Sequence, residues 1–351
     1  MEMNEKGKHR LFEWNKTLTI IVLTILLFIS IVVAVSIGPV SIPFRETVYI
    51  FLHKLSIPVD IVFEDKHAVV ITDIRLPRVL LAGLVGCALA ISGVTMQGLF
   101  RNPLVEPGFI GISSGAAFGA VLAISLGLTA IHQAILPLVA FLGAIFAMVL
   151  ILLVWRVTNS NSIALLLLLG IGMNAFFSSF TNVLIASSST EQELRGALLW
   201  LQGGLEGTTW EQVKIVGPII LIGSIIICLF GRSLNVMLLG DEQAITSGVR
   251  LHLVRNSLLT IVALMTGAAV AVSGIISFVG LVVPHMLRLV IGADHRLLLP
   301  ASMLTGAIFL MMMDLISRMI LQPVTLQVGV VSAMVGAPIF IILILRSVRR
   351  G

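Results

Sequence analysis

Apolar runs of about twenty residues dominate this sequence, and about 20 apolar residues are what a helix needs to cross a hydrocarbon core of about 30 Å. Short polar breaks separate these runs. The composition agrees, since 58% of the 351 residues are hydrophobic and only 11% are charged, against about 25% charged in a soluble domain. We therefore expect an all-α, polytopic membrane protein surrounded by lipid.

The apolar runs predict a bundle of about ten transmembrane helices in one domain. The run from Ser257 to Gly292 is too long for one crossing, so we divide it near Ser273-Gly274, where small residues allow a helix break. The first run, Leu18 to Ile37, is too long for the core of a cleavable signal peptide and is expected to remain as a span. The predicted spans are residues 17–37, 79–99, 109–129, 133–155, 163–186, 215–231, 257–275, 277–291, 298–321 and 327–346.

Lys and Arg residues indicate how these spans are oriented. An even number of spans places both termini on one side, and cytoplasmic loops are enriched in Lys and Arg. With cytoplasmic termini, the inner loops hold fourteen of the 22 Lys and Arg residues and the outer loops hold eight. The predicted layout is a cytoplasmic segment 1–16, a ten-helix domain 17–346 and a cytoplasmic tail 347–351. No basic patch with interleaved aromatic residues suggests a nucleic-acid partner.

Two polar segments between spans are expected to have structure of their own. The external segment 38–73 mixes charges of both signs with apolar residues, as an interfacial segment would. The internal segment 232–256 forms the one large cytoplasmic surface, with two short helical pieces expected on either side of Gly240.

A third polar segment, residues 187–214, predicts a short helix over the outer mouth of the bundle. Thr190 and Glu193 have the spacing of a capping box, in which the hydroxyl accepts from a backbone N–H three residues on. The stretch 194–201 has helical character, and Gly203-Gly204 is suited to ending it.

Motifs for covalent chemistry are missing from the sequence. There is no G-x-x-x-x-G-K-[ST] loop for nucleotide phosphates, so any ATP must be hydrolysed by a partner. HExxH and GxSxG motifs are also absent, which leaves no machinery for a membrane protease or an ester hydrolase. Cys87 and Cys228 lie in apolar runs without neighbours at metal-ligand spacing, so we interpret them as core residues. We predict neither an enzyme nor a metal site.

Ionisable residues are rare inside the spans. Ion-coupled transporters need such groups near the midplane to carry a proton or sodium ion, so an ion-coupled secondary transporter is the less favoured class. The exceptions, Asp314 and Arg318, lie four residues apart near the external end of the ninth span, where a helical ion pair is the favoured explanation.

Four polar residues share one face of the fifth span, at offsets of 4, 7 and 8 residues. They are Asn174, Ser178, Thr181 and Asn182. The spacing leaves two alternatives open, a face that lines a wet pathway or one that hydrogen-bonds neighbouring helices.

Small residues at helical spacing predict close helix packing in the second and third spans. The residues concerned are Gly83, Gly86 and Gly93, and Gly111, Gly115 and Gly119.

A specific resemblance to a known family begins at residue 75. The stretch RLPRVLLAGLVGCALAISGVTMQGLFRNPLVEPGFIGISSGAAFGA (75–120) resembles the FecCD-like permeases of type II ABC importers, which carry iron-siderophores, haem and cobalamin. The resemblance resumes in LNVMLLGDEQAITSGV (234–249), in SGIISFVGLVVPHMLRLVIGADHRLLLP (273–300) and in VGVVSAMVGAPIFIILILR (328–346). It covers essentially the whole chain from about Leu18.

The resemblance implies a set of partners in the cell membrane. Such permeases form a homodimer, or a heterodimer with a close paralogue, and two ABC ATPase subunits dock on the cytoplasmic side. ATP and Mg would be bound by those ATPases, with no cofactor in this subunit, and an extracytoplasmic substrate-binding protein would dock outside. The family's coupling segment corresponds to about 232–256 here. The residues expected to couple to the ATPase are Leu234, Leu238, Leu239, Gly240, Asp241, Glu242, Ala244 and Gly248.

Three external arginines match the family positions that dock the binding protein. They are Arg75 and Arg78 in the RLPR motif and Arg318 in DLISR. Contact with lipid headgroups or a pair with Asp314 would also explain them, but the resemblance favours docking, with rim contacts that act mostly on association rate and specificity.

Other motif positions bear on helix ends and on the substrate. Pro284 in VVPHMLR, Asn102-Pro103 and Glu106-Pro107 are expected to shape helix ends and breaks. His285 is expected to form structural hydrogen bonds and not to bind metal. Many relatives have Ala-Glu-Leu-Pro before the final helix where this chain reads PVTLQVGVV from Pro323, which alters the outer mouth.

The expected function is that of the permease of an ATP-driven importer. It would move a bulky metal chelate, an iron-siderophore or haem, into the cytoplasm by alternating access, with cobalamin as the alternative substrate of the same family.

Overall fold

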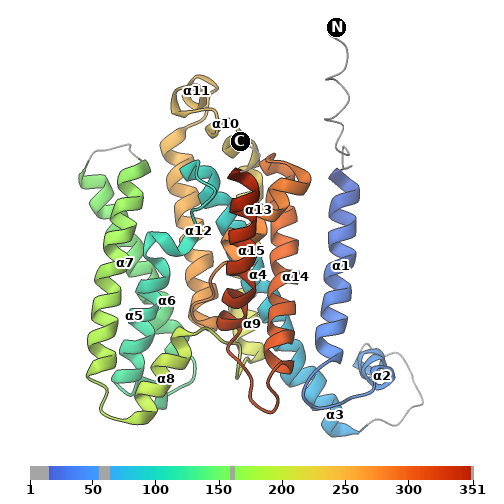
Figure 1. Cartoon of the computed structure of the whole chain (residues 1–351). Helices are drawn as coiled ribbons and strands as arrows, with labels where there is room; N and C mark the ends of the chain where they lie inside the picture. The colour runs from blue at the N-terminus through green and yellow to red at the C-terminus, as the bar shows by residue number, and fades with distance from the viewer. Residues whose placement is uncertain (1–15, 55–63, 159–162, 349–351) are drawn as a thin grey trace.

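The computed structural model describes residues 16–54, 64–158 and 163–348, and every regular element in these ranges is a helix. The helices run roughly alongside one another and form a bundle (Figure 1). Seven are long and apolar enough to cross a membrane. They are α1 (Lys16–Ser36), the continuous helix Asp65–Phe100, α6 (Ile135–Val157), α7 (Ile163–Ala186), α9 (Trp210–Leu229), α12 (Leu251–Ser273) and α14 (His295–Met319).

Three shorter apolar helices coincide with the remaining predicted spans. They are α5 (Ile112–Ser125), α13 (Val279–Ile291) and α15 (Val328–Val348). The predicted all-helical membrane architecture is therefore confirmed. The number of crossings and the cytoplasmic side of the termini stay predictions, although α1 begins and α15 ends at the same end of the bundle (Figure 1).

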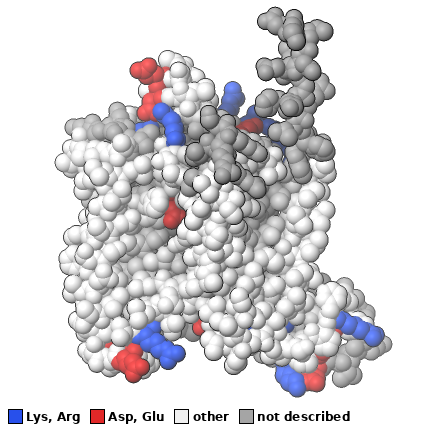
Figure 2. Space-filling view, viewed as in Figure 1, with Lys and Arg blue, Asp and Glu red and all other residues white. Residues whose placement is uncertain are grey.

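Charged side chains gather at the two ends of the bundle, and the broad band between them on the visible face is almost free of charge apart from an acidic side chain in its upper part (Figure 2). Large apolar side chains are exposed along this band, among them Phe28, Leu142 and Ile225 at 64%, 55% and 62%. Because exposed apolar surface of this extent is stable only in lipid, the band marks the part of the molecule inside the membrane.

The predicted break near Ser273-Gly274 is present. α12 ends at Ser273, and Gly274 follows with φ +65°, a backbone conformation that favours glycine. The Ser273 carbonyl accepts from Gly204 N–H at 2.8 Å, so a protein neighbour satisfies the broken backbone, as lipid could not. Phe278, also at positive φ, then precedes α13.

Close helix packing at the predicted glycines is confirmed. α4 (Leu76–Phe100) is the central helix, and almost all of its residues from Val79 onward are buried. A Cβ atom at Gly86 would lie 2.2 Å from the Gly306 carbonyl oxygen of α14, and one at Gly115 would lie 2.5 Å from the Gly143 carbonyl oxygen of α6. Only glycine permits these backbone approaches.

The segment 38–73, predicted to be external, contains more helix than the sequence indicated. α2 (Phe44–Lys54), α3 (Asp65–Val69) and the π-helical turn η1 (Val70–Arg75) occupy the stretch that was predicted to be interfacial, and α3, η1 and α4 are continuous. The second span thus begins well before residue 79, because its first turns extend beyond the apolar run into the polar end of the bundle. Residues 55–63 of this segment lie outside the described ranges.

The predicted outer helix is α8 (Glu191–Leu201), which lies at the end of the bundle opposite to the start of α1 (Figure 1). Thr190 Oγ1 accepts from Glu193 N–H at 3.2 Å, which confirms the predicted N-cap. The Glu193 carboxylate returns to the backbone N–H of Ser189, one residue before the position of a standard capping box.

Two short helices, α10 (Gly231–Met237) and α11 (Asp241–Thr246), lie at the same end as the start of α1 (Figure 1). Gly240 separates them with φ +126°, which only glycine adopts readily. This arrangement confirms the prediction of two helical pieces around Gly240.

Candidate functional site

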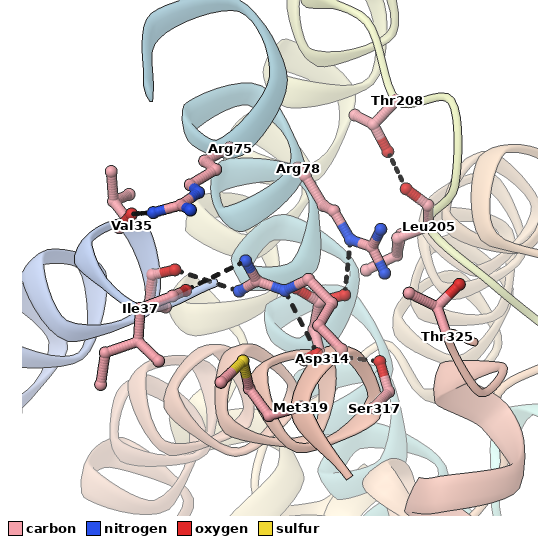
Figure 3. A network of polar contacts seen from close by, with 12 residues as sticks. Val35, Ile37, Arg75, Arg78, Leu205, Thr208, Asp314, Ser317, Met319 and Thr325 are labelled. Atoms are coloured by element: carbon pink, nitrogen blue, oxygen red, sulfur yellow. Dashed lines mark hydrogen bonds and ion pairs between the residues drawn. The ribbon is translucent and has the colours of Figure 1, made fainter. Parts of the chain in front are cut away.

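A buried carboxylate joins two helices at the end of the bundle that is predicted to be external (Figure 3). Asp314 on α14 has no exposed surface, and its Oδ1 accepts from Arg78 Nε at 2.8 Å. Its Oδ2 lies 3.0 Å from Arg318 Nε, which confirms the predicted pair four residues apart. Arg78 adds a second ion pair from α4 that sequence spacing could not show.

Two of the predicted docking arginines hold the end of α1. Arg75 Nη1 donates to the carbonyls of Val35 and Ser36 at 3.1 and 3.0 Å, and Arg318 Nη2 donates to the Ala34 carbonyl at 3.0 Å. The last carbonyls of a helix lack intrahelical partners and carry partial negative charge, so the two guanidiniums cap α1.

The three arginines are more buried than the exposed rim position that the sequence suggested. Arg75 and Arg318 are 4% and 3% exposed, and the Arg78 side chain is 13% exposed. Arg78 Nη2 has no hydrogen-bond partner within the described part of the chain. That atom is itself buried, so only the partial exposure of its side chain distinguishes Arg78 from the other two, and the docking role stays a prediction.

The polar face of α7 lines a cavity of about 300 Å³, and all four predicted residues are in its wall. The other wall residues include the loop between α4 and α5, with Glu106, Pro107, Gly108 and Phe109, and the hydroxyls of Ser113, Ser114, Thr266 and Ser277. Among the described residues, the wall of this cavity contains the single carboxylate of Glu106 and no Lys, Arg or His.

The α7 face forms hydrogen bonds to neighbouring elements and also lines the cavity, while its role in a wet pathway stays a prediction. Asn174 Nδ2 donates to the Gly108 carbonyl at 3.1 Å, and its Oδ1 accepts from Ser114 Oγ at 2.7 Å. Thr181 Oγ1 donates to the Phe177 carbonyl of its own helix at 2.8 Å. Ser178 and Asn182 are exposed. The face therefore anchors the α4–α5 loop at one position and presents free polar groups to the cavity at two others.

The predicted coupling residues divide into an outward and an inward set. Leu238 and Leu239 are 38% and 67% exposed, and Glu242 and Gly248 are also exposed. Leu234 and Ala244 are fully buried, so they hold the segment on the bundle. Ile245 of α11, which was not among the predicted coupling residues, is a further exposed apolar side chain of the segment, at 59%.

Asp241 belongs to the inward set. Its carboxylate is ion-paired with Arg101, which follows the last residue of α4, and with Arg255 of α12, whose Nη2 lies 3.2 Å from Asp241 Oδ2. Arg101 Nε also donates to the Met237 carbonyl at 2.8 Å. One acidic residue of the coupling segment is thus tied to two spanning helices.

A second charged cluster at this end centres on Asp294, which the sequence reading did not single out. Its carboxylate accepts from Lys16 Nζ at 2.6 Å, from Asn235 Nδ2 at 2.7 Å and from the Arg296 N–H at 3.0 Å. The hydrogen bond from Lys16 is the largest cause that lowers the pKa of Asp294 to about 2. The cluster joins α1, α10 and the start of α14.

His285 on α13 does not form the expected structural hydrogen bonds. Neither of its ring nitrogens has a partner among the described residues. Within the same ranges, no group of three His, Cys, Asp or Glu side chains is arranged to hold a metal ion.

The segment that departs from the family pattern lies at the outer mouth. Thr325 Oγ1 donates to a carboxylate oxygen of Glu206, and the Leu326 N–H donates to the Ser317 carbonyl at 3.1 Å. The segment is therefore tied to the loop after α8 and to the end of α14 that carries Arg318.

Comparison with known proteins identifies the lineage of this architecture. The model of the FecCD transport family matches residues 25–346. The chain belongs to the FecCD transport family. It is 39% identical over 331 residues to the uncharacterized ABC transporter permease protein YvrB of Bacillus subtilis (strain 168), covering 93% of this chain and 92% of the relative.

Two further FecCD relatives have named substrates. The hemin transport system permease HmuU of Yersinia pestis is 44% identical over 78% of this chain and 83% of its own length. The cobalamin import system permease BtuC of Halobacterium salinarum is 40% identical over 80% of this chain and 74% of its own length. A solved structure that covers 93% of this chain and 98% of its own chain has TM-score 0.82 and 32% identity, and its protein is provisionally assigned as a metal-chelate type ABC transporter in an inward-facing conformation.

Membership of the FecCD family shows what kind of protein this is, which partners its family works with and where it is located. Its members are permease subunits of ABC transporters and are not enzymes themselves. They work with ATPase subunits and a substrate-binding protein. With its apolar helices, this FecCD chain is a multi-pass protein of the bacterial membrane.

Proposed function

We propose that this chain is the permease of an ATP-driven importer that moves a bulky metal chelate, an iron-siderophore or haem, into the cytoplasm. The observation that carries the proposal is the polar cavity between α5, α7 and the α4–α5 loop, which gives a FecCD permease a hydrogen-bonding space inside its apolar bundle. A groove made mostly of hydroxyl and amide groups, with Glu106 as the one carboxylate of its described wall, suits a chelate that travels intact, because one carboxylate is not a ligand set that would strip the ion.

The proposed assembly contains two permease copies, two ATPases and one binding protein. The second copy would cover α7, whose exposed surface mixes Phe176 and Phe180, 49% and 48% exposed, with the polar Ser178 and Asn182. Exposed polar groups at membrane depth favour a protein or water contact over lipid. A close paralogue could take the place of the second copy and cover α7 in the same way.

The ATPases would bind α10 and α11, where Leu238, Leu239 and Ile245 form an exposed apolar surface at the end of the bundle. ATP and Mg would be held by those partners. The binding protein would dock at the opposite end near Arg78, and ATP binding would shift the bundle between outward- and inward-open states, since ATP acts by binding those states unequally.

The substrate is the finer part of the proposal. Relatives of similar identity are named for hemin and for cobalamin, and the solved relative is assigned to metal chelates. We favour an iron-siderophore or haem, with cobalamin as the alternative, since all three are bulky metal complexes that a cavity shared by two copies could pass.

Transport by purified components tests this proposal. The chain would be reconstituted in proteoliposomes with its ATPase and binding protein, and uptake of ferric siderophore, haem and cobalamin would be measured with and without ATP on the ATPase side. We expect uptake of one ligand that requires ATP hydrolysis, with a non-hydrolysable ATP analogue as the control. Uptake driven by an imposed ion gradient without ATP would overturn the proposal.

A further inference from the structure

The loop between α4 and α5, residues 101–111, connects the two regions described above. At its start, Arg101 contacts both halves of the coupling segment, donating from Nε to the Met237 carbonyl of α10 and pairing with the Asp241 carboxylate of α11. Near its end, Gly108 and Phe109 line the polar cavity. Few residues therefore separate the cytoplasmic coupling surface from the cavity wall.

Asp241 is held on both sides by charge. Arg255 of α12 is 1% exposed, and its Nη2 lies 3.2 and 3.4 Å from the two carboxylate oxygens. Arg101 approaches the same carboxylate from the end of α4. Charge-assisted contacts of this kind constrain geometry more tightly than neutral hydrogen bonds, so α11 cannot move far without displacing Arg101 or releasing it.

The other end of the loop, at Gly108 and Phe109, is attached to α7 by hydrogen bonds. Asn174 of α7 donates to the carbonyls of Gly108 and Phe109 at 3.1 and 3.3 Å, and it accepts from Ser114 of α5. A shift of the loop is therefore transferred to α7, the helix whose polar face lines the cavity.

The backbone conformations of Arg101 and Gly240 hold the two sides of the Arg101–Asp241 contact in place. Arg101 is one of two non-glycine residues at positive φ among the described residues, with φ 48°, so its side chain leaves α4 at the point where the chain turns back. Gly240, beside Asp241, has φ +126° and lets α10 and α11 meet the same guanidinium. Strained or glycine-only conformations of this kind persist where the surrounding contacts demand them.

We propose that Asp241 is a positioning residue: through its ion pair with Arg101 it transmits the movement of the coupling segment to the 101–111 loop and so to the cavity. Asp241 forms its ion pairs within this chain, with Arg101 and Arg255. The exposed Leu238, Leu239 and Ile245 are the side chains that would contact the ATPase. The inference rests on the proposed function, because it assigns a route for the coupling that an ATP-driven permease requires. Coupling requires an element whose two arrangements are favoured unequally by the two sites, and we assign that role to the 101–111 loop.

The test uses the complete transporter in proteoliposomes and compares uptake per ATP hydrolysed. For Asp241→Asn we expect this ratio to fall by roughly 10-fold, within the usual range of coupling effects, while ATPase activity is kept. Asp241→Glu should restore most of the ratio, because the charge is retained. The double variant Asp241→Asn with Arg101→Gln should lose little more than Asp241→Asn alone, since that single variant already breaks the ion pair between the two residues.

A second readout separates transmission from mere stability. The native cysteines Cys87 and Cys228 would be replaced by Ala, and Ser178→Cys in the cavity wall would be probed with a methanethiosulfonate reagent in the absence and presence of ATP. We expect ATP to change the labelling rate in the parent and to leave it unchanged in Asp241→Asn. Asp65→Asn, an acidic residue at the external end of the bundle, is the matched control and should behave as the parent.

The possible outcomes are distinct. If the parent transports with ATP and Asp241→Asn keeps both its uptake per ATP and its ATP-dependent labelling, the inference is wrong and the proposed function stands. If uptake and ATPase activity fall together with the melting temperature, Asp241 only stabilises the fold, and the inference is also wrong. If the parent shows no ATP-driven uptake of any chelate, the proposed function fails first and the inference with it.

Discussion

Individual charged residues in this protein act mainly between helices. Asp314 joins α4 to α14, Arg75 and Arg318 cap α1, and Asp241 joins α11 to α4 and α12. Buried ions are costly in an apolar environment unless they are paired or hydrogen-bonded, so the contacts of the buried Asp314, Arg75 and Arg318 are a requirement of the fold. The Asp241 side chain is 34% exposed, so this argument does not extend to it.

Removal of the Asp314 carboxylate should be strongly destabilising. Asp314→Asn leaves the guanidiniums of Arg78 and Arg318 buried without a counter-charge, and breaking a buried pair in this way costs about 3–5 kcal/mol. Thermal unfolding in detergent should show a clearly lower melting temperature. Asp65→Asn, at an external position outside the network, is the control, and equal melting of the two variants would contradict the structural role.

The charged cluster at Asp294 should make stability depend on pH in the acid range. The pKa of Asp294 is lowered to about 2 by Lys16, so its contribution is complete above the ordinary value of 3.8 and is lost as the pH falls through about 2. Because 36% of the side chain is exposed, solvent screening limits the contribution to about 1 kcal/mol. The melting difference between the parent and Asp294→Asn should be present at pH 7 and vanish towards pH 2; a constant difference would contradict it.

At the scale of elements, the coupling segment combines an exposed apolar surface with a buried attachment. Leu239 is 67% exposed while Leu234 and Ala244 are fully buried. An exposed apolar patch at the polar end of a membrane protein is typical of a docking surface.

A charge on this surface should prevent ATPase docking and leave the permease folded. Leu239→Glu is expected to abolish stimulation of ATP hydrolysis by the binding protein, because an ion would enter an apolar contact. The melting temperature should be unchanged, since the side chain is exposed. Leu126→Glu, 62% exposed just after α5 and far from the coupling segment along the chain, is the matched control. Normal coupling in Leu239→Glu would exclude this surface as the docking site.

At the scale of the whole molecule, the surface of α7 predicts a second copy of the chain. Ser179→Cys on the exposed part of α7, in a background without Cys87 and Cys228, should give dimers with a bis-maleimide cross-linker in membranes. Ile225→Cys on α9, 62% exposed on an apolar face, should remain monomeric because lipid covers it. Equal cross-linking at both positions would indicate random collision and would contradict a dimer through α7.

The sequence by itself determined the features that depend on neighbours along the chain. Apolar runs located the spans, the spacing of Thr190 and Glu193 located the start of α8, and Gly240 located the turn between α10 and α11. Each of these signals is complete within a few turns of helix, because burial in lipid, capping and backbone torsion are local effects. The four polar residues of α7 could likewise be assigned to one face, although not to a cavity.

Only the tertiary structure decided which charges meet between different helices. Arg78 and Asp314 are 236 residues apart in the chain. Arg318 and Ala34 of α1, whose carbonyl accepts from it, are 284 residues apart. Arg101 and Asp241 are 140 residues apart, and nothing in their local spacing pairs them. Helices such as α4 and α14 bring these groups together through close packing of small residues such as Gly86 and Gly306, and that register depends on the shape of both surfaces at once. This is why the sequence placed the three arginines on an outer rim, while the packed bundle holds them largely buried against its own carboxylate and carbonyl groups.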